Sequence, residues 1–301
     1  MAAVSLPSAR GLSGLFVSAR PAQWVKNLVL PLPFLFGGAL ATARGWKLAA
    51  LGFAVFCAIT SAIYLVNDVM DRERDRAHPV KRRRPLAAGE LGVTTAITAA
   101  VALGVAGLAA AFVLSPRFGR WSALYAALML AYSLWLKRIP FLEALIVAAG
   151  LPLRALAGAA LAGLVPSSFL TGCAYLLALF LVIGKRQWEL QNAGHVSSSE
   201  HRPALAAYRH EGLDFLFVVT ALATVAAYSA YSVVPSTISM HGQSLAVTVP
   251  FVVLGVARYV RLVYRRGGGG NPTRALLIDD PWILLIVLGW VAAAGWIIYV
   301  R

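Results

Sequence analysis

Repeated apolar runs, each near 20 residues long, are the feature that most limits what this chain can fold into. A run of about 20 apolar residues crosses the hydrocarbon core of a bilayer as one α-helix. The chain is 59% hydrophobic and only 13% charged, which is far too apolar for a soluble domain. We therefore predict an all-α, polytopic membrane protein in which residues 1–301 form a single transmembrane domain.

Nine runs are predicted as transmembrane helices. They cover residues 24–42, 47–68, 92–115, 119–136, 140–163, 168–187, 213–234, 245–264 and 281–300. With a cytoplasmic amino terminus, most of the 27 lysines and arginines, and all 12 acidic residues, lie at or near the cytoplasmic side. The positive-inside rule supports this orientation, so we expect the chemistry at the cytoplasmic face. Residues 1–20 predict an amphipathic segment that lies in the membrane interface.

The net charge of +15 has a simpler explanation than nucleic acid. Basic residues between apolar spans follow from topology and from attraction to anionic membrane lipids or an anionic substrate. Nucleic acid is therefore not expected as a partner. Cys57 and Cys173 both lie inside apolar runs, so we expect neither a disulfide framework nor a thiolate metal site.

A polar island follows the second run and carries the strongest chemical signal. If the helix continues past its apolar part, Asn67, Asp71 and Asp75 fall at i, i+4 and i+8, with Asp68 beside them. Carboxylates crowded on one face repel one another, so a cation is expected between them. Oxygen ligands without thiolate or paired histidine suit a hard cation, and Mg²⁺ adds substrate phosphates to its ligands.

Basic residues follow these acids directly. The run from Lys81 to Arg84 offers donors for further phosphate oxygens. Acids followed by bases predict a site for a magnesium-bound diphosphate. The alternative is a solvated juxtamembrane loop that topology alone keeps basic. On the first interpretation, residues 69–91 and residues 188–212 are cytoplasmic active-site loops.

Two ionisable residues near the fifth run are also informative, because charge inside a membrane normally faces a cavity or a partner. Glu143 and Arg154 are about three helical turns apart and share a face. They indicate a polar cavity that enters from the cytoplasm. A buried arginine that only pins helices together is the open alternative.

The polar island resembles the first aspartate-rich motif of the UbiA-type intramembrane prenyltransferase superfamily, N-D-x-x-D-x-x-x-D. Asn67, Asp68, Asp71 and Asp75 match it position by position, and His78 to Pro85 matches the H-P-x-K-x-x-R-P continuation. Tyr132 with Lys137 is similar to the Y-to-K element after the fourth helix. The resemblance covers the whole chain and implies nine transmembrane helices around a central cavity.

The second polar loop departs from the pattern of most members, which carry a second aspartate-rich motif there. This chain has Lys185, Arg186 and Glu189 instead. Together with the stretch from Arg20 to Asn27, and with Asn271-Pro272 followed by Leu276 to Asp279, it resembles the decaprenyl-phosphate phosphoribosyltransferase branch.

That branch implies transfer of 5-phosphoribose from phosphoribosyl diphosphate to a polyprenyl (decaprenyl) phosphate at the cytoplasmic face of a bacterial inner membrane, for arabinose-containing cell-wall polymers. A lipid phosphate is already an anion, so no strong general base is required. We also expect that copies of the chain could associate as a homo-oligomer. Transfer of a prenyl group to an aromatic or haem acceptor is the alternative enzyme, and a transporter or lipid-binding protein is the alternative of another class.

The expected roles follow the motifs. Mg²⁺ ligands are Asn67, Asp68, Asp71 and Asp75, and charge on the departing diphosphate is stabilised by Lys81, Arg84 and Lys137, so that the expected catalytic set is Asp68, Asp71, Lys81, Arg84 and Lys137. Substrate contacts are expected from Lys26, Asn27, Arg138, Arg154, Lys185, Arg186 and Glu189.

Overall fold

The computed structural model describes residues 9–191, 210–241, 243–265, 272–275 and 280–299. Most of the predicted loop 188–212, the residues before position 9, Asn271 and the stretch from Leu276 to Asp279 lie outside the described residues. The described elements are all helical, as predicted. In chain order the longer helices are α1 (Ala9–Ser18), α3 (Ala43–Met70), α6 (Val93–Leu114), α7 (Pro116–Leu134), α8 (Leu142–Ala162), α9 (Ser168–Gln191), α10 (His210–Val233), α12 (Val249–Tyr264) and α14 (Pro281–Tyr299).

Shorter elements join these helices. They are η1 (Pro21–Val29), α2 (Leu32–Phe36), η2 (Ala39–Ala41), α4 (Arg72–Ala77), η3 (Lys81–Arg83), α5 (Pro85–Ala88), η4 (Leu136–Arg138), α11 (Pro235–His241), η7 (Ala246–Thr248) and α13 (Pro272–Arg274). Within the described chain, seven helical segments are long and apolar enough to cross a membrane. The protein is therefore an integral, multi-pass membrane protein.

The first predicted span differs from a single helix. Residues 21–41 form η1, α2 and η2 instead. Pro31 and Pro33 lack the backbone N–H that a continuous helix needs, and Gly38 adopts a φ of +69°, which ends the path. Neither this stretch nor α7 belongs to the seven long apolar segments.

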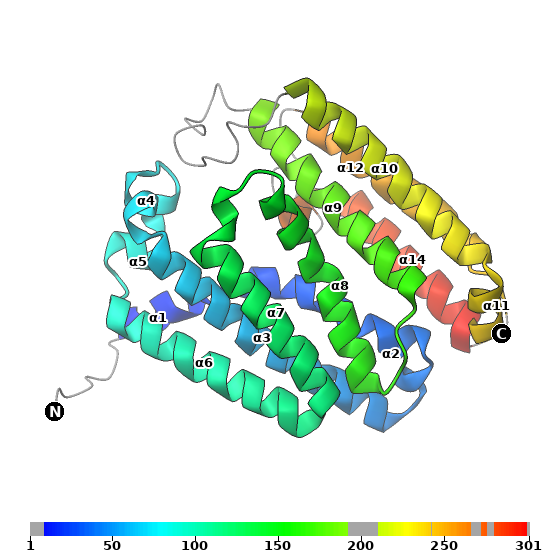
Figure 1. Cartoon of the computed structure of the whole chain (residues 1–301), viewed down its shortest axis with the longest axis horizontal. Coiled ribbons are helices and arrows are strands. Elements are labelled where there is room, and N and C mark those ends of the chain that lie inside the picture. Colours follow the sequence, from blue (N-terminus) through cyan, green and yellow to red (C-terminus); the bar gives the residue numbers. More distant parts are fainter. Residues whose placement is uncertain (1–8, 192–209, 242, 266–271, 276–279, 300–301) are drawn as a thin grey trace.

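Two groups of helices form the molecule (Figure 1). In the first, α3 packs against α6, α7 and α8, around a core in which the Phe56 ring lies 5.9 Å from Phe118 and 5.2 Å from Tyr125. In the second, α9 packs against α10 and α12, where Phe180 stacks on Phe217 at 5.2 Å. Helices α8 and α9 join the two groups.

A close backbone approach fixes η1 against α8. A Cβ atom at Gly158 would lie 2.0 Å from the backbone oxygen of Leu30, so only glycine fits there. This approach brings Asn27 to Arg154, with 2.9 Å between Oδ1 and Nε. The stretch that follows the amphipathic α1 is thereby part of the interior. Leu12, Phe16 and Val17 of α1 are exposed. That this helix lies in the membrane interface stays a prediction.

Candidate active site

The end of α3 carries the acidic residues that the sequence singles out. Backbone hydrogen bonds from Asp71 N to Asn67 O (2.9 Å) and from Asp75 N to Asp71 O (2.8 Å) continue the helical path from α3 into α4. Asn67, Asp71 and Asp75 consequently line one cavity of about 520 Å³. Asp68 is buried and pairs with Arg20. The predicted common face is confirmed for the three residues at i, i+4 and i+8.

Arg84 joins two of these carboxylates. Its Nη1 atom lies 2.5 Å from Oδ2 of Asp75 and 3.3 Å from Oδ1 of Asp68. Both aspartates are nearly inaccessible, at 4% and 3% exposure, so their charges require this partner. Arg20, which adopts a φ of +55°, adds a second positive charge beside Asp68.

Lys137 of η4 forms an ion pair with Asp71. Its Nζ atom lies 2.7 Å from Oδ1 of Asp71 and 3.4 Å from Oδ1 of Asn67. Arg74 also donates to Asp71, at 2.9 Å. Asp71 is the most accessible of the three aspartates, with a side chain 19% exposed, and it lies at the cavity.

The donor chemistry of this cluster fits Mg²⁺, since it consists of carboxylate and amide oxygens. In the described part of the chain, no three acidic, histidine or cysteine side chains gather around one point. The reason is visible in the contacts: the Arg84 guanidinium lies between Asp75 and Asp68, and the Lys137 ammonium between Asp71 and Asn67. Both spaces favour positive charge.

Lys26, Asn27 and Arg154 lie together deeper in the protein. Arg154, on α8, is 7% exposed and donates to Asn27 Oδ1 at 2.9 Å, to Tyr125 OH at 2.6 Å and to Gly150 O at 2.6 Å. These acceptors are neutral, so the positive charge remains available to an anion. Lys26 and Arg154 both line the cavity.

The wall formed by α9 is organised around Arg186, which is 4% exposed. Its Nε and Nη2 atoms each lie 2.7 Å from a different carboxylate oxygen of Glu143, and Nη1 lies 2.7 Å from Oε2 of Glu189. Lys185 Nζ is 4.0 Å from Oε1 of Glu189. The expected direct contact of Arg186 with a phosphate does not follow from this arrangement, because two carboxylates already engage its guanidinium.

The remaining predicted residues lie in the loops beside the cavity. Lys81 and Arg138 both line it. His78 accepts hydrogen bonds through Nδ1 from the backbone N of Val80 (3.1 Å) and of Lys81 (3.3 Å), which fixes the turn that carries Lys81.

Several residues that line the cavity were not among those predicted for the site. Three of them, which contact predicted site residues, are Arg20, Tyr125 and Glu143. Tyr125 lies seven residues before Tyr132 on α7. Residues seven apart share a helical face, so the spacing of the two tyrosines could have identified Tyr125 from the sequence. Glu143 was expected to mark the cavity together with Arg154, and both do line it. Its partnership with Arg186 carries no sequence signal, because 43 positions separate the two.

Comparison with known proteins identifies relatives along nearly the whole chain. The model of the UbiA prenyltransferase family matches residues 30–278. A decaprenyl-phosphate phosphoribosyltransferase of Mycobacterium tuberculosis is 34% identical over 297 residues, covering 97% of this chain and 96% of the relative. The protein of the same name from Mycolicibacterium smegmatis is 33% identical over 300 residues, covering 96% and 93%.

The fold has a close counterpart among solved structures. A UbiA homolog from Archaeoglobus fulgidus, bound to GPP and Mg²⁺, superposes with a TM-score of 0.72 at 19% identity, covering 95% of this chain and 99% of the other. The arrangement of helices is thus shared, although the sequences have diverged widely. The chain belongs to the UbiA prenyltransferase family and is a membrane-embedded transferase.

Proposed function

We propose that this protein transfers 5-phosphoribose from phosphoribosyl diphosphate to a polyprenyl phosphate, such as decaprenyl phosphate, with release of diphosphate. The observation that carries the proposal is the charge of the cavity: ten basic side chains line it against four acidic ones. A cavity of this kind suits substrates with several phosphate groups. The relatives are named decaprenyl-phosphate phosphoribosyltransferase, which supports a phosphoribosyl group as the group transferred and decaprenyl phosphate as the acceptor.

The distribution of the charges favours this donor over a prenyl diphosphate. Acidic oxygens suited to a metal lie at the end of α3, whereas the α9 wall presents Lys185 and the paired Arg186 without an aspartate. Phosphoribosyl diphosphate has a diphosphate that requires a metal site, and a 5-phosphate that requires cations. The wall with the aspartates corresponds to the diphosphate end, and the wall with Lys185 and no aspartate corresponds to the 5-phosphate end.

Asn67, Asp68, Asp71 and Asp75 are the proposed ligands of Mg²⁺. The metal, when bound, would neutralise charge on the donor diphosphate and improve it as a leaving group. Arg84 and Lys137 are then proposed to turn from the carboxylates toward the diphosphate oxygens. Together with Lys81, which lines the same cavity, they would stabilise the charge that grows there as the bond to ribose C1 breaks.

The acceptor needs no proton removed from it. Its phosphate oxygen is an anion at neutral pH and forms the new bond to C1, while the electron pair of the broken bond leaves with the diphosphate. We assign Lys26, Asn27 and Arg154 to holding the acceptor phosphate. Lys185 is assigned to the 5-phosphate, and Arg138 to the approach of the donor.

Arg186 and Glu189 are proposed to position rather than to bind. Glu143 of α8 and Glu189 of α9 both pair with the guanidinium of Arg186, and Glu189 also lies beside Lys185. The alignment of Lys185 toward the donor would depend on this group of charges.

The proposed setting is the cytoplasmic face of a bacterial inner membrane. All the described basic and acidic cavity residues belong to the loops and helix ends predicted to be cytoplasmic, or to the interior below them. In the proposed nine-pass topology, α7 and the broken stretch 21–41 would join the seven long apolar segments.

The proposal is tested with the purified full chain in nanodiscs that contain polyprenyl phosphate. On addition of Mg²⁺ and phosphoribosyl diphosphate, mass spectrometry should detect the phosphoribosylated lipid, and a chelator should prevent its formation. Product formed from a prenyl diphosphate and an aromatic acceptor, with none from phosphoribosyl diphosphate, would instead establish the prenyl-transfer reaction.

A further inference from the structure

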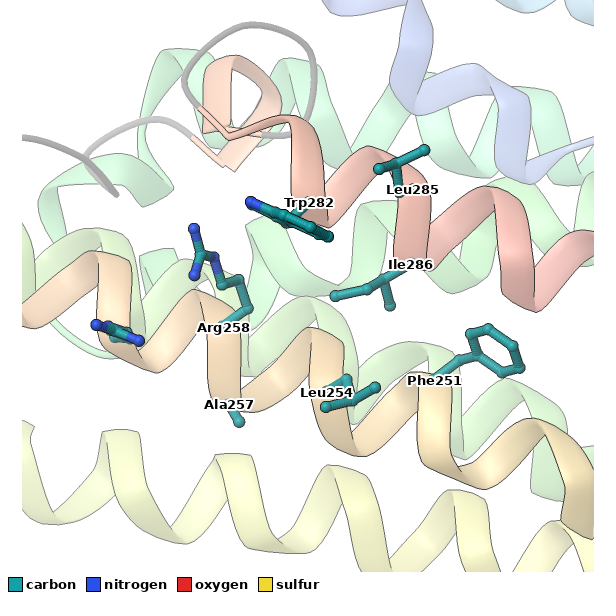
Figure 2. A pocket seen from close by; sticks show the side chains of 8 residues that line it. Phe251, Leu254, Ala257, Arg258, Trp282, Leu285 and Ile286 are labelled. Carbon is teal, nitrogen blue, oxygen red and sulfur yellow. The ribbon is translucent and has the colours of Figure 1, made fainter.

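A second hollow, of about 530 Å³, lies between α12 and α14 (Figure 2). It shares no lining residue with the candidate active site. Its walls are Phe251, Leu254 and Ala257 on one helix and Leu285 and Ile286 on the other. Leu254 and Leu285 are 56% and 57% exposed. The hollow is thus an apolar slot on the outer surface of the helix bundle, where lipid surrounds the protein.

The opposite face of α12 points to the protein interior. Tyr259 is buried there, and its ring packs against the Phe180 ring in an edge-to-face arrangement with 5.4 Å between the ring centroids. The residues of the slot and those of the interior therefore lie on different sides of one helix. The slot is separate from the cavity lined by Asp71 and Arg154.

One end of the slot is polar. Arg258 and Arg261 line it in the last two turns of α12, three residues apart on the same face. Trp282 lies opposite, and its indole nitrogen points toward the end where the Arg258 guanidinium lies (Figure 2). Tryptophan at the end of a long apolar helix is typical of the membrane–water interface.

Hydrogen bonds fix the residues at the polar end of the slot. Asp280 accepts from Nε of Arg258 at 2.7 Å and from the backbone N of Trp282 at 2.9 Å. It is 2% exposed and ties the start of α14 to the end of α12. This carboxylate neutralises one positive charge, so the exposed Arg261 leaves the polar end with a net positive charge.

The length of the slot matches one layer of lipid. Phe251 and Arg261 are ten residues apart, which corresponds to about 15 Å of helix, or half of a hydrocarbon core of about 30 Å. A phosphate at the arginines would therefore allow its acyl chains to follow the apolar walls as far as Phe251. A protein helix seated here would bury the charge of Arg261 without a partner, at a large cost.

We infer that the slot between α12 and α14 is a binding site for an anionic phospholipid, with the headgroup phosphate at Arg258, Arg261 and Trp282. The inference is independent of the proposed reaction, because the slot shares no residue with the candidate active site. The lipid would hold α14 against α12 at the end where both helices meet the loop between them.

Native mass spectrometry of the full chain in detergent tests the site, by titration with phosphatidylglycerol or phosphatidylcholine. The first phosphatidylglycerol should bind about fivefold more tightly than phosphatidylcholine, which corresponds to ~1 kcal/mol for one basic residue near the headgroup. Arg261→Gln should remove this preference. Ala257→Trp, which fills the slot without changing charge, should weaken the binding of both lipids.

Arg265→Gln is the matched control, since Arg265 is an exposed arginine at the end of the same helix that does not line the slot. It should bind both lipids as the unmodified chain does. Equal binding of the two lipids, or equal effects of Arg261→Gln and Arg265→Gln, would overturn the inference. A raised KM for polyprenyl phosphate in Arg261→Gln, with phosphatidylglycerol binding unchanged, would assign the slot to the acceptor instead and also overturn it.

Discussion

The ammonium group of Lys137 lies 2.7 Å from Oδ1 of Asp71, although 66 positions separate the two residues. This contact brings the loop after α7 to the end of α3, where the helical path from α3 into α4 bends at Asp71. A cation that reaches a carboxylate beside a cavity can move to a substrate phosphate once a metal neutralises that carboxylate. In the proposed function, the pair would therefore link the metal site to the stabilisation of the leaving group.

Asp71→Asn should lower turnover by roughly 100-fold or more, because it removes the most accessible carboxylate of the proposed Mg²⁺ site. Initial rates of phosphoribosyl-lipid formation across a Mg²⁺ titration measure the effect. Glu73→Gln is the matched control, since Glu73 belongs to the same loop but is 74% exposed and pairs with Arg76. Equal rates in the two variants would contradict the proposed metal site.

Arg154→Met should lower turnover by roughly 100-fold, because it removes the buried positive charge assigned to the acceptor phosphate. The thermal unfolding temperature should change little, since the desolvation cost of the buried charge is removed together with its hydrogen bonds. An arginine that only pins helices together would give the opposite pattern, with lower stability and near-normal turnover of the folded fraction. Arg120→Met serves as the control, because Arg120 is an exposed arginine near the start of α7.

Glu143→Gln should destabilise the protein by about 3–5 kcal/mol, because it leaves the buried guanidinium of Arg186 with one carboxylate instead of two. Arg186→Met should cost a similar amount. If the pair acts as a unit, the double variant should lose less stability than the two single variants together. Denaturation of all four proteins in the same detergent measures the coupling, and strictly additive losses would exclude it.

Lys185→Ala should weaken inhibition by ribose 5-phosphate about tenfold, the loss expected for one charged hydrogen bond to phosphate. Inhibition by inorganic diphosphate should stay nearly constant, because the diphosphate is assigned to the other wall of the cavity. Lys47→Ala is the control, because Lys47 lies near the start of α3, at the end opposite to the acidic residues. If both inhibitors weaken equally in Lys185→Ala, the assignment of the 5-phosphate to Lys185 is wrong.

Helical spacing explains which site residues could be predicted from the sequence. The residues at i, i+4 and i+8 from Asn67 to Asp75 line one cavity because a helix places them on one side whatever surrounds it. Glu143 and Arg154, about three turns apart on α8, both line that cavity for the same reason. The apolar runs predicted the helices from residue 43 onward to within a few residues, since a bilayer requires that length.

The prediction of one continuous helix fails over residues 21–41. The run is apolar enough to suggest a span, but Pro31, Pro33 and the positive φ of Gly38 interrupt it. Its close contact with α8 depends on Gly158, more than 100 positions later. Hydropathy measures the solvent that a segment prefers, and it does not record such contacts.

The sequence by itself determined an all-helical membrane protein, the family motif and the face of α3 that carries the acids. Only the tertiary structure decided the partners of the charges: Arg84 between Asp68 and Asp75, Lys137 on Asp71, and Arg186 between Glu143 and Glu189. The first set depends on the geometry of one helix and on the bilayer, which are local and general. The second set depends on which helix ends meet, and each buried charge then pairs with the nearest opposite charge that packing brings to it.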